Sequence, residues 1–97
     1  MTRTILWSGN ALAHLRDIYG YIADDSPQAA FAVHDAIDAT VDRLATNPHL
    51  GRPGRVSGTR ELVVGAYPDY LVVYEVVASA VHILAVRHSA RRWPDKF

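Results

Sequence analysis

The chain has 97 residues, of which 49% are hydrophobic and 21% are charged, and its ten Lys and Arg residues balance ten Asp and Glu residues. This length predicts one domain over residues 1–97, and the hydrophobic content is too high for a disordered chain. We expect neither a membrane span nor a secretory signal, because no apolar run approaches ~20 residues and the N-terminal one is too short. The absence of cysteine excludes disulfides, thiolate metal sites and cysteine nucleophiles.

The neutral total conceals a division of charge along the chain. Residues 1–50 carry three arginines against six aspartates, whereas residues 51–97 carry seven basic residues against four acidic ones. Nine of the ten basic residues are arginine, whose planar fork binds phosphates and carboxylates with paired hydrogen bonds. The pattern indicates either an anionic partner or a set of solvated surface charges.

The first third of the chain predicts a short strand followed by a helix. Residues 2–7 are rich in β-formers, and Ser8 can cap a following helix. The helical stripe comprises Ala11, Leu15, Ile18 and Ile22. Ser26 and Pro27 then suit the N-cap and first position of a second helix.

The second helix has apolar residues at spacings of three and four, and Asn47-Pro48 ends it. Its stripe comprises Ala30, Val33, Ile37, Val41 and Leu44. Because the break between the helices is short, we expect an antiparallel helical hairpin.

The second half of the chain predicts a loop and then a meander. His49 to Gly58 has the Gly and Pro content of a loop, and β-rich runs follow at residues 59–64, 70–77 and 80–87. The predicted fold class is therefore α+β, with an N-terminal strand and a two-helix antiparallel hairpin packed on an antiparallel sheet of about four strands. We expect the first strand at an edge or beside the last strand.

The last hairpin allows a prediction of register. A two-residue loop at Ala78-Ser79 would place Val77 opposite Ala80, Glu75 opposite His82 and Tyr70 opposite Arg87. Both faces of that hairpin are largely apolar. We therefore expect a terminal segment or a partner chain to cover the face that the helices leave open.

Histidine supplies the best candidate for proton transfer. None of the five histidines has metal-site spacing, so we expect neither a metal nor a cofactor. His88 follows the last strand and is the best general acid or base by its ordinary pKa. The alternative is a strand-end histidine that is hydrogen-bonded to the backbone.

Basic residues gather in the loop and at the end of the last strand. The candidates for a phosphate or target contact are Arg52, Arg55, Arg60, Arg87, Arg91 and Trp93. If the sheet brings Arg60 near Arg87, these guanidiniums would share one end of the molecule and suit a phosphodiester backbone. Trp93 could stack on a base, or it could pin the C-terminus onto the sheet.

The order of elements and several motifs together resemble the RelE/ParE superfamily of bacterial type II toxins across essentially the whole chain. The motifs are Trp7-Ser8, Asn47-Pro48, Gly51-Arg52-Pro53-Gly54-Arg55, Thr59-Arg60-Glu61-Leu62-Val63, Val72-Val73-Tyr74-Glu75-Val76 and Val86-Arg87-His88 through Pro94. The resemblance implies a small cytoplasmic toxin that arrests growth, serves plasmid or chromosomal maintenance and is neutralised by a ParD/RelB-like antitoxin.

The superfamily offers two mechanisms. ParE-like members inhibit DNA gyrase and have no known hydrolytic site, whereas RelE-like members cleave mRNA in the ribosome. The chain would be an enzyme only in the second case, with Arg60 and Arg87 for phosphate charge and His88, with His49 or Glu61, for proton transfer. We favour the gyrase inhibitor, because arginine is a poor general base.

The resemblance also implies where the antitoxin binds. Leu12 and Tyr19 are apolar positions left over after the main helical stripe is buried, and they suit a helix-in-groove contact. A third reading is a non-toxic module that only binds an antitoxin.

Overall fold

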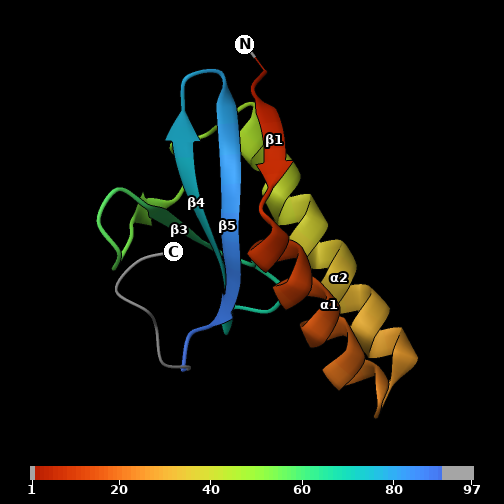
Figure 1. The fold of residues 1–97 in the computed structure, drawn as a ribbon. Coiled ribbons are helices and arrows are strands. Elements are labelled where there is room, and N and C mark those ends of the chain that lie inside the picture. Colours follow the sequence, from red (N-terminus) through yellow and green to blue (C-terminus); the bar gives the residue numbers. More distant parts are fainter. Residues whose placement is uncertain (1, 91–97) are drawn as a thin grey trace.

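The computed structural model describes residues 2–90 of the chain (Figure 1). In chain order, its elements are β1 (Thr4–Trp7), α1 (Gly9–Ala23), α2 (Pro27–Asp42), the short 3-10 helix η1 (Arg43–Ala45), β2 (Arg52–Pro53), β3 (Arg60–Val63), β4 (Tyr70–Val77) and β5 (Ala80–His88). None of the helices in this part of the chain is long and apolar enough to span a bilayer.

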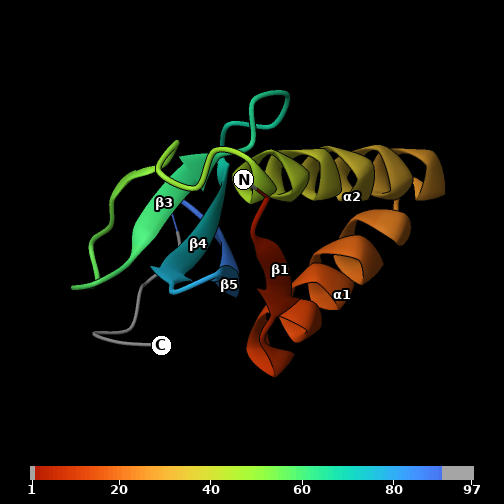
Figure 2. The same cartoon turned by 90° about the horizontal axis from the view of Figure 1, so that it is seen from above.

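The two helices begin at the residues that the sequence predicts. The hydroxyl of Ser8 accepts the N–H of Ala11 at 3.0 Å, and the hydroxyl of Ser26 accepts the N–H of Ala29 at 3.1 Å. Each contact satisfies one N–H that the first helical turn leaves without a partner. Pro27 lies at the first position of α2. The two helices form the expected hairpin along one side of the sheet (Figures 1 and 2).

The predicted α+β class, a helical hairpin on a sheet, is confirmed. The sheet has five strands in the order β1-β5-β4-β3-β2 and is mixed, whereas about four antiparallel strands were expected. Strand β1 lies beside the last strand, as expected, but runs parallel to it. Because β1 and β5 are far apart in sequence, no tight turn forces them to be antiparallel. The extra strand, β2, pairs Arg52 with Glu61 and Pro53 with Arg60, inside the segment predicted as a loop.

A β-bulge changes the predicted register of the last hairpin. Val77 faces Ala80 and Glu75 faces His82, as predicted, but Tyr70 faces His88 and not Arg87. The pairing shifts where Tyr74 faces Ile83 and Val73 faces Ala85, which leaves Leu84 as an extra residue in β5. Because side chains alternate between faces, this residue reverses the alternation in the rest of β5.

The core lies between the helical hairpin and one face of the sheet. The buried residues that form it are Ala11, Val33, Ile37, Val41, Leu44, Val64, Val72, Tyr74, Val81, Ile83 and Val86. Leu71, Val73 and Ala85 lie on the opposite face by register, and they are also buried. Each of these three residues is at most 2% exposed in the single chain.

Candidate functional site

One buried carboxylate organises the arginine-rich loop. Glu61 is 2% exposed, and its Oε1 lies 3.2 Å from Nη2 of Arg52 and 3.8 Å from Nε of Arg55. Its Oε2 accepts the backbone N–H of Arg55 at 2.7 Å. A buried charge needs such partners because it has lost its water. Arg52 and Arg55, which were predicted to bind phosphate, therefore also balance a charge inside the protein.

Tyr74 fixes the start of the same loop. Its buried hydroxyl accepts the N–H of Gly51 and donates to the carbonyl of Pro48, both at 2.8 Å. Burial raises the pKa of Tyr74. A Cβ atom on Gly51 would lie 2.7 Å from this hydroxyl, so only glycine fits here. Arg60 adds a bond from Nη1 to the carbonyl of Gly51 at 2.6 Å.

The sheet does not bring Arg60 and Arg87 together. Arg60 faces Tyr74, which faces Ile83, and Arg87 lies four residues further along β5. At ~3.3 Å per residue and ~4.8 Å per strand, their Cα atoms are roughly 16 Å apart. The predicted basic cluster is therefore divided in two. Arg91 and Trp93, the remaining predicted contact residues, lie outside the described residues.

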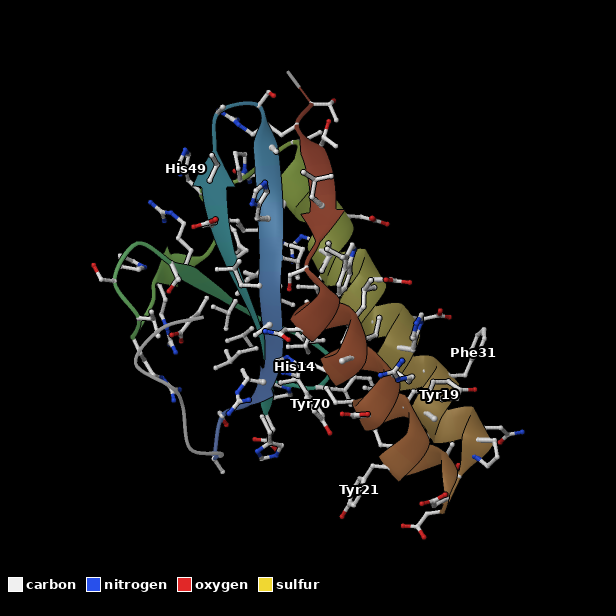
Figure 3. The ribbon with its side chains drawn as sticks, viewed as in Figure 1. His14, Tyr19, Tyr21, Phe31, His49 and Tyr70 are labelled. Atoms are coloured by element: carbon white, nitrogen blue, oxygen red, sulfur yellow. The ribbon has the colours of Figure 1, made fainter. Side chains whose placement is uncertain are left out.

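His88 makes the contact expected of a structural histidine. Its Nδ1 accepts the N–H of Ala90 at 3.2 Å, and its ring meets that of Tyr70 edge to face, with centroids 5.4 Å apart. A neutral imidazole has one acceptor and one donor nitrogen, so this bond leaves the proton on Nε2. Figure 3 shows that His49 lies at the opposite end of the sheet from Tyr70, so the two histidines considered for nuclease chemistry are not neighbours.

A polar pocket lies beside His88 where β1 has ended and α1 borders the open edge of β5. Ser8 Oγ donates to the carbonyl of Leu84 at 3.1 Å, and the N–H of Val86 donates to Nδ1 of His14 at 3.3 Å. The pocket measures about 380 Å³, and its polar lining comprises His14, Asp17, Tyr21, Tyr70, Arg87 and His88. Figure 3 shows His14 and Tyr70 close to each other at this end of the sheet.

The pocket changes the titration of His14. Burial lowers the pKa of His14 and the positive charge of Arg87 lowers it further, while Asp17 opposes both effects. Sequence reasoning did not select His14 as a site residue. The signal was absent because the pocket depends on where β5 ends relative to α1.

An apolar groove of about 340 Å³ lies between α1 and α2. Its lining comprises Leu12, Leu15, Arg16, Tyr19, Phe31 and His34. Leu12 is 52% exposed and Tyr19 37%, so both residues predicted for antitoxin binding line one groove. Sequence reasoning missed Phe31, which is 61% exposed, because it lies outside the apolar stripe of α2.

The described part of the chain has no group of side chains that could bind a metal ion. Within residues 2–90, no three His, Asp or Glu side chains lie close enough together to hold a metal ion. The structure thus presents three features to explain, namely the loop arginines, the polar pocket and the apolar groove.

Known proteins with the same arrangement define the class of this chain. The family described as the ParE toxin of the type II toxin-antitoxin system, parDE, matches residues 5–93. A solved structure titled as the chromosomal ParDE TA system from P. aeruginosa has a TM-score of 0.78 and 26% sequence identity, covering 90% of this chain and 96% of the other. The fold is thus that of a toxin from a toxin–antitoxin pair.

Two curated relatives agree with this class. A toxin designated Y4kP from Sinorhizobium fredii is 42% identical over 93 residues, which are 96% of this chain and 95% of that protein. Toxin RelE2 from Caulobacter vibrioides is 39% identical over 87 residues, which are 90% and 96% of the two chains. The chain belongs to the ParE toxin family of type II toxin–antitoxin systems.

Proposed function

We propose that this toxin arrests bacterial growth in the cytoplasm by inhibiting DNA gyrase, and that it serves plasmid or chromosomal maintenance. The observation that carries the proposal is the dispersal of the groups that RNA cleavage would need. Arg60 is bonded to Gly51, Arg87 lies roughly 16 Å away by register, and His88 accepts a backbone N–H. An inhibitor acts by binding and needs no such assembly.

The second candidate is a ribosome-dependent mRNA endonuclease. The name of the relative RelE2 and the adjacent Arg87 and His88 at the end of β5 favour it. Cleavage through the ribose 2′-hydroxyl requires a base with a free lone pair. With its proton on Nε2, the imidazole of His88 has no such lone pair facing away from the backbone, and this weighs against the nuclease.

The partner that we propose is an antitoxin that lays an amphipathic helix in the groove between α1 and α2. The related solved structure is titled as a ParDE system, and the groove exposes Leu12, Tyr19 and Phe31 side by side with one cation, Arg16. Apolar anchors from successive turns of a helix fill grooves of this kind, and an acidic residue at the rim of the bound helix would pair with Arg16.

Two assays on the purified chain separate the targets. Gyrase supercoiling should fall with increasing toxin, and pre-incubation with the antitoxin should restore it. A ribosome-dependent cleavage assay on a defined mRNA should show no product. Cleavage that His88→Ala abolishes would favour the nuclease, and unchanged supercoiling at stoichiometric excess of toxin would exclude gyrase as the target.

Induced expression in a bacterial host tests for a third class, a module that binds an antitoxin without being toxic. Growth arrest that co-expression of the antitoxin relieves supports a toxin. Unimpaired growth at a confirmed level of folded protein would support the non-toxic module.

A further inference from the structure

The polar pocket contains two imidazoles with the same hydrogen-bonding constraint. Nδ1 of His14 accepts the N–H of Val86, and Nδ1 of His88 accepts the N–H of Ala90. Each neutral ring must then carry its proton on Nε2, which is the nitrogen left for a ligand. Two rings from different elements, α1 and β5, thus offer N–H donors from the walls of one pocket.

We propose that this pocket binds a carboxylate group of an acidic polypeptide segment through the Nε2–H groups of His14 and His88. A carboxylate accepts hydrogen bonds through two oxygens and donates none, which suits a pocket lined by two imidazoles whose Nδ1 atoms already accept backbone N–H groups. The hydroxyl groups of Tyr21 and Tyr70 are further donors in the lining. The edge-to-face contact with Tyr70 fixes the ring of His88 before a ligand arrives.

The size of the pocket suits a side chain that enters from outside. Its volume of about 380 Å³ lies within the ~300–1,000 Å³ typical of ligand sites. It lies against the opposite side of α1 from the antitoxin groove, since residues 14, 17, 18 and 21 line one and residues 12, 15, 16 and 19 line the other. The pocket is therefore a site distinct from the groove.

The charges around the pocket favour a single carboxylate over a nucleic acid. Arg87 contributes one positive charge and Asp17 one negative charge to the lining. A phosphodiester chain that continued past Asp17 along α1 would meet Asp24 and Asp25 near the negative end of the helix dipole. A single carboxylate would contact the pocket alone and would not meet Asp24 or Asp25. This inference does not depend on gyrase being the target.

The test is an NMR titration of the full-length chain with three probes. The first is a capped tripeptide with a central glutamate, the second is the same peptide with glutamine, and the third is an oligothymidylate. We expect the glutamate probe to shift the imidazole resonances of His14 and His88 in a saturable way. The resonances of His34, His49 and His82 should stay in place, and the glutamine probe should leave all five unchanged.

Variants make the result specific to the pocket. His88→Ala should weaken binding of the glutamate probe about tenfold, the effect of removing one hydrogen bond to a charged group. His82→Ala is the matched control, since it removes a half-exposed imidazole from β5 outside the pocket and should leave binding unchanged. Equal shifts with the glutamine probe, no shift with the glutamate probe, or a response to oligothymidylate alone would each overturn the proposal.

Discussion

The hydroxyl of Ser8 donates a hydrogen bond to the carbonyl oxygen of Leu84 at 3.1 Å, across 76 residues of sequence. The same hydroxyl accepts the N–H of Ala11, and the backbone N–H of Ser8 donates to the carbonyl of Ile83 at 2.9 Å. One residue therefore begins α1 and also binds the bulge in β5. The two contacts fix the position of the first helix relative to the strand that ends at the polar pocket.

Ser8→Ala should lower the free energy of unfolding by about 2 kcal/mol, through loss of a helix cap and of a partner for the Leu84 carbonyl. Ser26→Ala is the matched control, because Ser26 caps α2 in the same way, through the N–H of Ala29. It should cost about 1 kcal/mol. Urea denaturation measures both, and equal losses would show that the bond to Leu84 contributes nothing.

Tyr74→Phe should destabilise the protein by roughly 2–4 kcal/mol, because it leaves the N–H of Gly51 and the carbonyl of Pro48 without their buried partner. Tyr21→Phe removes a hydroxyl from a side chain that is 75% exposed and should change stability by less than ~0.5 kcal/mol. Thermal and urea unfolding of both variants measure the difference. A change in Tyr74→Phe as small as that in Tyr21→Phe would be inconsistent with this role.

The free energy of unfolding should decrease as the pH is lowered, because of His14. The pKa of His14 is lowered in the folded state from 6.5, so below pH ~6.5 the unfolded chain binds a proton that the folded pocket disfavours. This contribution is fully present above the unfolded pKa and is lost as the pH falls from about 7 towards 5. Relative to His14→Gln, the parent chain should therefore lose stability over this range.

The control for the pH experiment is His49→Gln, which changes an exposed loop residue at the other end of the sheet. Its stability should follow the parent chain at each pH. If the difference between the parent and His14→Gln stayed constant from pH 7 to pH 5, burial of His14 would not contribute to the pH dependence.

Phe31→Ala should weaken antitoxin binding by about 2 kcal/mol, since exposed aromatic anchors dominate grooves of this kind. Folding should change by less than ~0.5 kcal/mol, because the side chain is 61% exposed. Val77→Ala removes an exposed apolar side chain outside the groove and should leave binding intact. Isothermal titration calorimetry against the antitoxin checks both, and equal affinities would place the antitoxin elsewhere.

Ala78→Gly should raise stability by about 0.5–1 kcal/mol. Ala78 has a φ of 49°, a conformation that costs an L side chain about 1–2 kcal/mol and glycine almost nothing. The neighbouring change Ser79→Gly should instead lower stability, because it adds freedom to the unfolded chain without relieving a positive φ. Chemical denaturation of the two variants should therefore give opposite signs.

Local signals predicted much of this fold. Ser8, Ser26 and Pro27 marked the helix starts because caps act over three or four residues. The two-residue turn at Ala78-Ser79 is also a local signal, and it determined the register of the residues next to the turn. The sequence gives no sign of the bulge at Leu84. The residues on both faces of β5 are largely apolar, so a one-residue shift leaves the hydrophobic pattern unchanged.

The candidate site was less predictable because its contacts join distant segments. The loop arginines were predicted to be phosphate ligands, but Arg52 and the N–H of Arg55 bind Glu61, which lies on the neighbouring strand β3. His14 acquired its partner 72 residues away, at Val86. Phe31 lay outside the stripe that predicts the core, and only the packing of α2 beside α1 made it part of a groove.

The short strand β2 sets a limit on how these molecules can associate. It forms one edge of the sheet, and Pro53 has no N–H to offer to a further strand. The other residue of β2, Arg52, adds a charge that a neighbouring strand would have to bury. Extension of the sheet by a second copy of the chain at this edge is therefore disfavoured.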